Sequence, residues 1–272
     1  MTMKRASLIL AAFVAAALPA FAGGNTEPDR LSRWQDLTSL IFGDEARIAP
    51  TDTLVTVEAP VRALDSALVP VTVRTSDLAV TGLTLVVDEN PGPMAARVAF
   101  GPAGDPRELG LRVRVDGYTN VHAVATRADG AMVANAAFVK GAGGCSAPVG
   151  TSDLEAMADM GEMRMKFAAA AEGIPEGTGR ATLMVRHPNF NGMQMNQQTR
   201  LYTPARYITD VAITRGGEQV LAMESDISLA TNPVIDFLYR TGSDAPFTVA
   251  VTDSGGAQWT QDFPAPEPQV TN

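Results

Sequence analysis

Cysteine and histidine are scarce in this chain of 272 residues, which contains one cysteine and two histidines. They are Cys145, His122 and His187. This content argues against a zinc site, because cysteine and histidine are the side chains that build one. The sequence also lacks the G-x-S-x-G, P-loop, dinucleotide-binding glycine and H-E-x-x-H motifs. We therefore expect a protein without a catalytic centre, metal or cofactor of its own.

Positive charge is also limited, because 21 lysines and arginines stand against 30 acids and leave a formal net charge of −9. An acidic chain is a poor ligand for nucleic acid and for anionic membrane surfaces. Neither is expected as a partner, whereas a protein with a basic docking face would suit this charge.

Apolar runs long enough to resemble a targeting segment occur only in the first 22 residues. Lys4 and Arg5 precede an apolar run from Leu8 to Leu18, and Ala20-Phe21-Ala22 forms a cleavage site. This order predicts a secretory signal peptide over residues 1–22. Its removal would leave 272 − 22 = 250 residues with a net charge of −11 and no membrane anchor.

The mature chain begins with a helical pattern and then changes to the alternation typical of strands. Apolar residues at helical spacing predict an amphipathic helix over Arg30–Phe42 that docks on the first domain. The residues expected on its apolar face are Leu31, Trp34, Leu37, Leu40 and Ile41. In the first half, short segments of period two predict strands at 54–57, 69–73, 83–87, 111–115, 122–126 and 132–139.

The second half repeats this pattern after a possible helical turn at 152–161, capped by Ser152 or Asp153. Strands are predicted at 163–167, 181–185, 207–215, 219–224, 227–229, 235–239, 247–251 and 258–263. A Gly216-Gly217 turn joins two of them. Strands at such spacing without intervening helices indicate antiparallel β-sandwiches. The predicted organisation is an N-terminal segment at 23–46, sandwiches at 47–150 and 179–264, a connection at 151–178 and a tail at 265–272.

The single cysteine lies in the segment Gly141-Ala142-Gly143-Gly144-Cys145-Ser146-Ala147-Pro148. Glycine restricts the backbone least, so we expect Cys145 on a flexible, open arm rather than in the core. An exported protein seldom keeps a lone thiol, because an oxidising compartment modifies it. The arm residues Gly141, Gly143, Gly144, Ser146 and Pro148 therefore suggest a thiol that other proteins reach.

Landmarks along the first half resemble SoxY, the sulfur-carrying subunit of the bacterial Sox system for sulfur and thiosulfate oxidation. They are Glu58-Ala59-Pro60, Val69-Pro70-Val71, Asn90-Pro91-Gly92-Pro93, Phe100, Arg112-Val113-Arg114, Asp129-Gly130, and Val139-Lys140 running into Gly143-Gly144-Cys145. The second half resembles SoxZ, the partner subunit, through Arg186-His187-Pro188, Gly192, Thr203 to Ile208, and Ser228 to Pro233. The fused chain is similar to the quinoprotein dehydrogenase-associated SoxYZ-like carriers.

This resemblance implies two immunoglobulin-like sandwiches packed together in the periplasm, with Cys145 carrying a sulfur intermediate to partner enzymes. It also implies an association with PQQ-dependent dehydrogenases. One departure concerns the arm, which ends the chain in SoxY but is internal here. A tethered loop reaches less far than a free tail, and Pro148 stiffens it further.

Three other groups of residues have possible roles near this arm. Lys140 could lower the pKa of the thiol, although a solvated lysine at a strand end is the commoner situation. His187 could dock near the arm or pair with Cys145, although a structural loop role is favoured. Met193 and Met195 with His187 could bind copper, but two methionines and one histidine fall short of usual copper sites.

Two functions remain open from the sequence. The first is a covalent carrier that holds a small adduct on Cys145 as a persulfide, thiosulfonate or mixed disulfide. The second is a non-covalent scaffold for a periplasmic quinoprotein dehydrogenase system, which would bind its partner in a salt-sensitive way that ignores Cys145.

Overall fold

The computed structural model describes residues 26–148, 150, 152–168, 173–196 and 199–266. The predicted signal peptide and most of the predicted tail lie outside these residues. Neither helix of the described chain has the length and apolar run needed to cross a bilayer.

The first element is helix α1, Glu27–Phe42, which begins three residues earlier than the apolar pattern predicts. Thr26 caps it, because the Asp29 carboxylate accepts a hydrogen bond from the Thr26 backbone N–H at 3.0 Å. The helix docks on the first half through buried Leu37, as expected. Leu31 and Leu40 remain 59% and 76% exposed, so the docking face is narrower than the sequence pattern predicts.

Eight strands follow in the first half of the chain. They are β1 (Ile48–Pro50), β2 (Val55–Glu58), β3 (Val69–Thr75), β4 (Val80–Val87), β5 (Met94–Phe100), β6 (Gly104–Val113), β7 (Thr119–Arg127) and β8 (Met132–Val139). The alternation in β3 buries Val69, Val71 and Val73 and turns Pro70 outward, which is the period of a half-buried strand. Strands β1 and β5 were not predicted from the sequence.

The second half contains helix α2 and seven strands. They are α2 (Asp153–Ala158), β9 (Met163–Phe167), β10 (Thr178–Val185), β11 (Ile208–Arg215), β12 (Glu218–Ser225), β13 (Val234–Arg240), β14 (Phe247–Asp253) and β15 (Gln258–Phe263). Ser152 caps α2, as predicted. The strand predicted at 227–229 is wrong, because the chain turns there and only Leu229 makes an isolated bridge, to Val113.

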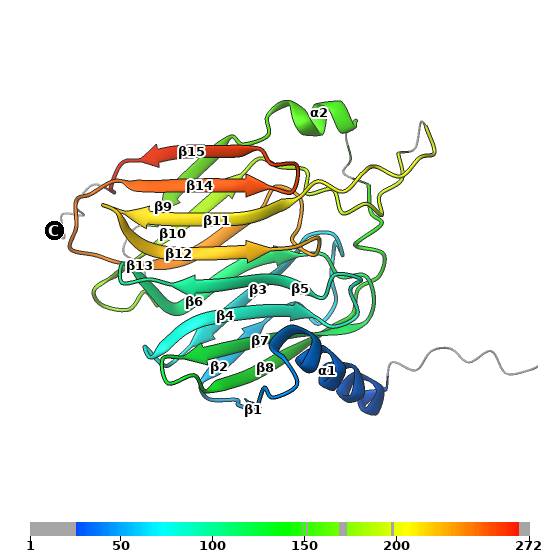
Figure 1. Ribbon diagram of the computed structural model, residues 1–272, viewed down its shortest axis with the longest axis horizontal. Helices are drawn as coiled ribbons and strands as arrows, with labels where there is room; N and C mark the ends of the chain where they lie inside the picture. Colours follow the sequence, from blue (N-terminus) through cyan, green and yellow to red (C-terminus); the bar gives the residue numbers. More distant parts are fainter. Residues whose placement is uncertain (1–25, 149, 151, 169–172, 197–198, 267–272) are drawn as a thin grey trace, which may run out of the picture.

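All these strands form two sheets that run through both halves (Figure 1). The larger sheet has the order β1-β8-β7-β4-β5-β12-β11-β14-β15, and the smaller has the order β2-β3-β6-β13-β10-β9. Antiparallel pairs β5–β12 and β6–β13 join the halves in both sheets. The predicted all-β architecture of two sandwiches is therefore confirmed, with the addition that the sandwiches are joined edge to edge.

One continuous hydrophobic core fills the space between the sheets, from Val55 and Val121 in the first half to Val249 and Phe263 in the second. Burying apolar surface across the junction holds the two halves in a fixed relation. Loops from both halves meet beside this junction, and the cysteine segment that follows β8 lies among them.

Candidate functional site

Cys145 is buried, with 1% of its surface exposed, so the expectation of an open thiol is wrong. The segment after β8 does not project from the molecule but turns back along the residues that follow β6. Gly141 and Gly144 are buried with Cys145, whereas Ala142, Gly143 and Ser146 face solvent.

The glycines of this segment allow close packing. This is the physical reason why the segment is buried and does not form the flexible, open arm that was expected. A Cβ on Gly144 would lie 2.0 Å from the carbonyl oxygen of Ser66 and 2.6 Å from that of Val115. A Cβ on Gly141 would lie 2.7 Å from a methyl of Val115. Gly143 takes a φ of +68°, which other residues rarely adopt. Glycine gives an unfolded chain conformational freedom. In this fold, the missing side chain lets the backbone of the cysteine segment contact the backbones of Ser66 and Val115.

Hydrogen bonds fix the buried segment from both halves of the chain. The N–H groups of Gly143 and Gly144 donate to the carbonyls of Asp116 and Val115 at 2.9 and 3.1 Å. The Cys145 N–H donates to Asp116 Oδ1 at 3.1 Å. From the second half, Asn191 Nδ2 donates to the Cys145 carbonyl at 2.7 Å. Cys145 is thus held where the two halves meet.

This environment keeps the thiol protonated. Burial, with a smaller contribution from the Asp116 carboxylate, raises the pKa of Cys145 to about 12. The Arg114 guanidinium acts in the opposite direction but does not overcome burial. Since the thiolate is the nucleophile, the protonated Cys145 thiol is a poor nucleophile in this position.

Arg114 is a buried cation that bridges the two halves beside Cys145. Its guanidinium donates to the Gly144 carbonyl at 3.3 Å, to the Asn189 carbonyl at 3.2 Å and to Thr231 Oγ1 at 2.7 Å. Only 1% of the residue is exposed. The sequence pattern placed Arg114 among family landmarks without a role, because its burial depends on the second half of the chain covering it.

Lys140 lies at the start of the arm, and Ser146 and Pro148 lie at its end. The Lys140 backbone pairs with Val61 and Ala63, which anchors the N-terminal side of the arm. The charges that act on the thiol are Asp116 and Arg114 rather than Lys140. Ser146 Oγ donates to the Gly143 carbonyl at 3.2 Å, and Pro148 is exposed.

His187 does not pair with Cys145, because both of its ring nitrogens have other partners. Nδ1 lies 2.7 Å from Asn189 Oδ1, and Nε2 lies 3.4 Å from Asp253 Oδ2. Burial lowers the pKa of His187 and favours the neutral imidazole. Asn189 in turn accepts from Arg114, so His187 supports the loop that covers the cysteine.

Met193 and Met195, the residues of the copper hypothesis, lie with His187 in the chain segment between β10 and β11. Met195 forms an isolated bridge with Tyr202, and the Met193 N–H donates to Asn191 Oδ1 at 3.0 Å. Within the described ranges, no three His, Cys, Asp or Glu side chains cluster in a way that could hold a metal ion.

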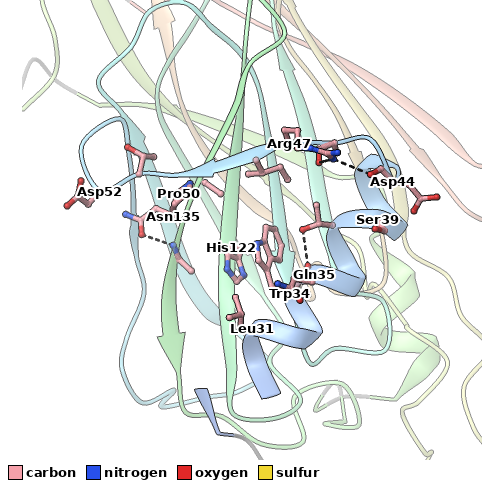
Figure 2. A pocket seen from close by; sticks show the side chains of 16 residues that line it. Leu31, Trp34, Gln35, Ser39, Asp44, Arg47, Pro50, Asp52, His122 and Asn135 are labelled. Atoms are coloured by element: carbon pink, nitrogen blue, oxygen red, sulfur yellow. Dashed lines mark hydrogen bonds between the residues drawn. The ribbon is translucent and has the colours of Figure 1, made fainter. Parts of the chain in front are cut away.

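A hollow of about 980 Å³ lies between α1 and the outer face of β7 and β8 (Figure 2). Trp34 stacks on His122 there, with ring centroids 3.7 Å apart. His122 Nδ1 lies 2.9 Å from Asp88 Oδ1, and burial raises the pKa of Asp88. Trp34 was expected on the docking face of the helix, whereas no sequence pattern points to a role for His122. The hollow is lined by α1 and lies apart from the residues that hold Cys145.

The molecule is thus a pair of joined β-sandwiches with one sequestered thiol at their junction and a buried arginine beside it. Comparisons with family models place two domains on this frame. The model of sulfur oxidation protein SoxY matches residues 39–145, and that of sulphur oxidation protein SoxZ matches residues 167–264. The chain therefore belongs to the SoxY and SoxZ families of sulfur-oxidation proteins, fused in tandem, and its SoxY match ends on Cys145.

Solved structures and curated proteins complete the comparison. The sulfur carrier protein SoxY from Chlorobium limicola f thiosulfatophilum is 26% identical over 41% of this chain and 94% of its own, with a TM-score of 0.34. A β-glycosidase from Bacteroides vulgatus is 7% identical over 79% of this chain and 25% of its own, with a TM-score of 0.25. The search of curated proteins found no match.

Proposed function

We propose that this protein is a periplasmic covalent carrier, which holds a small sulfur-containing group on the Cys145 thiol and presents it to partner enzymes. The observation that carries the proposal is the position of the cysteine. The chain's one thiol ends the SoxY match and sits at the junction with the SoxZ domain, held by Asp116 from one side and Asn191 from the other.

The buried position defines a resting state of this carrier. A protonated thiol reacts slowly with oxidants and disulfides, which protects it in an oxidising compartment. Loading requires the thiolate, so the arm must leave its buried position before a partner enzyme can attach a group. Burial of the thiol thus separates storage from transfer without any catalytic residue in the carrier itself.

The anchors on both sides of the arm limit how far the released thiol can travel. Lys140 is held by Val61 and Ala63, and on the other side Asp153 accepts hydrogen bonds from Asn196 and Thr203. Cys145 lies five residue steps along the chain from Lys140. At about 3.4 Å per extended residue, the thiol reaches at most about 17 Å from that anchor. A partner enzyme must therefore have an active site that lies close to the carrier and can accommodate a loop.

Intact mass of the protein isolated from its native periplasm, with and without reductant, tests the proposal. A mass increase that reductant removes and that maps to Cys145 supports the carrier and identifies its cargo. A Cys145→Ser variant that folds and still supports the pathway in vivo would refute it. A bare thiol under inducing conditions would favour the scaffold function, and a low-salt pull-down with a PQQ-dependent dehydrogenase would then test that association.

A further inference from the structure

The space of about 980 Å³ beside α1, the α1 hollow, contains an imidazole with an unused ring nitrogen. His122 Nδ1 lies 2.9 Å from Asp88 Oδ1, and among the described residues Nε2 has no hydrogen-bond partner. Although the side chain is only 11% exposed, Nε2 is not fully buried. His122 lines the α1 hollow and also a smaller hollow of about 250 Å³ next to it. The nitrogen is therefore accessible to a ligand.

Two neighbours fix the orientation of the His122 ring. The Trp34 indole stacks on its face, with ring centroids 3.7 Å apart and ring planes 8° from parallel (Figure 2). Asp88 holds the ring through Nδ1 and is itself completely buried. The imidazole cannot turn over without losing its hydrogen bond to Asp88. A hydrogen-bonding group that is held in place before a ligand arrives binds that ligand at a low entropic cost.

The charge of Asp88 decides what Nε2 offers to a ligand. Burial raises the pKa of Asp88, because a carboxylate without water is poorly stabilised. Its Oδ2 atom is buried and has no donor among the described residues. Arg33 attracts the carboxylate, but its Nε donates to the backbone carbonyl of Asp88, at 3.0 Å. A proton on His122 balances the carboxylate directly and makes Nε2 an N–H donor.

The walls of the α1 hollow suit a ligand with an apolar body. Its volume is that of a small-molecule site, which typically measures about 300–1,000 Å³. Apolar side chains of the lining come from α1, β1 and β8, namely Leu31, Ile48, Pro50, Ala134 and Ala136. An apolar lining with one fixed polar group is the usual composition of such sites.

The exposed part of the lining carries charges of both signs. In the described chain, Arg47 donates only to the backbone carbonyls of Asp44 and Ala46, so its charge is left to attract an anion. The side chains of Asp44 and Asp52 also line the hollow and act against an anion. These exposed charges are screened by water, so the contact with buried His122 decides the preference.

We propose that the α1 hollow binds a small carboxylic acid with an apolar body, whose carboxylate accepts a hydrogen bond from His122 Nε2. A ligand that arrives as the acid gives its proton to the Nε2 of a neutral imidazole. A ligand that arrives as the carboxylate binds the imidazolium, and both routes end in the same complex. Hydrogen bonds between charged groups are about twice as strong as neutral ones. This site lies apart from Cys145 and does not depend on the proposed carrier function.

Three probes that share a phenyl ring and differ in charge test this assignment. They are benzoate, benzamide and benzylamine, titrated calorimetrically into the folded full-length protein. We expect benzoate to bind about ten-fold more tightly than benzamide, which is the effect of one hydrogen bond between charged groups. Benzylamine should bind more weakly than both, because its ammonium group would face the imidazolium.

A pair of matched variants tests whether the ligand lies in the α1 hollow. Ala136 lines the hollow and lies opposite His122 in the β7–β8 pair. Ala136→Leu should weaken benzoate binding at least ten-fold, because leucine occupies the space of the ligand and leaves both nitrogens of His122 in place. Ala212→Leu is the control, because Ala212 is exposed on β11 in the second half of the chain. It should leave the affinity unchanged.

His122→Gln tests the origin of the preference. Glutamine carries no charge, so this variant should bind benzoate and benzamide equally. It also removes the ring that contacts Asp88, so if it fails to fold, the Ala136 variant decides.

Four outcomes would overturn the assignment. Equal affinities of the wild type for benzoate and benzamide would show that the apolar lining alone binds the ring. A preference for benzylamine would show that Asp44 and Asp52 set the charge selectivity. Benzoate binding that survives Ala136→Leu would place the ligand elsewhere on the molecule. The absence of binding by all three probes at millimolar concentrations would refute the site itself.

Discussion

Gly144→Ala should release the cysteine arm, because the packing of this residue leaves no room for a side chain. The added Cβ would lie 2.0 Å from the Ser66 carbonyl oxygen and 2.6 Å from that of Val115. Both contacts are with backbone, which cannot rotate away. Gly144 is not among the residues with positive φ, so alanine is tolerated once the arm has moved.

The size of the effect follows from the contacts that the released arm loses. Gly144 donates to Val115 and accepts from Arg114, while Cys145 donates to Asp116 and accepts from Asn191. At about 1 kcal/mol for each hydrogen bond, the docked state loses about 4 kcal/mol, or nearly a thousand-fold in the docking equilibrium. The thiol pKa should return towards its ordinary value of about 8.5.

Alkylation of Cys145 by iodoacetamide at pH 8, followed by intact mass, measures this release. The wild type should react slowly, and Gly144→Ala should approach the rate of the protein unfolded in guanidinium. Gly117→Ala is the matched control, because Gly117 has no positive φ and its added Cβ would meet only the Glu89 Cβ, at an ordinary contact distance of 3.8 Å. If Gly144→Ala kept the slow rate and the melting temperature of the wild type, the close approach would not be what holds the arm.

The remaining predictions use the same assay or thermal unfolding. With pH, the released thiol loses its proton above about 8.5 while the docked thiol keeps it to about 12. Docking of the arm is therefore fully stable below the pKa of the released thiol and weakens about ten-fold per pH unit above it. The alkylation rate of the wild type should keep rising through pH 10. A plateau in this rate near pH 9 would contradict burial of the thiol. Asn191→Ala should speed alkylation about ten-fold by removing the hydrogen bond to Cys145. An unchanged rate would show that other contacts keep the arm docked. His187→Ala should lower the free energy of unfolding by about 2–4 kcal/mol, because it leaves a cavity and removes the hydrogen bonds of His187 with Asn189 and Asp253. A melting temperature within 1 °C of wild type would refute that structural role.

Most of the strand framework could be predicted from local patterns. The period-two segments around β3 and β14 lie where they were predicted, because alternation reflects which face a strand buries. Strand β5 was missed because Ala95 and Ala96 interrupt its alternation with two successive buried residues. It is nonetheless the strand that joins the SoxY half to β12, a pairing between segments far apart in the sequence.

The candidate site also has some features that the sequence predicts and others that depend on the tertiary structure. The sequence by itself determined that Cys145 is the only thiol, that glycines precede it and that it closes a SoxY-like domain. Only the tertiary structure decided that the thiol is buried, silent and surrounded by Asp116, Arg114 and Asn191. Local sequence describes what a glycine segment can do, whereas contacts from residues dozens of positions away fix which conformation it takes. In this chain the SoxY domain supplies the contacts of Asp116 and Arg114 and the SoxZ domain supplies that of Asn191, and together they hold the glycine segment in one buried conformation.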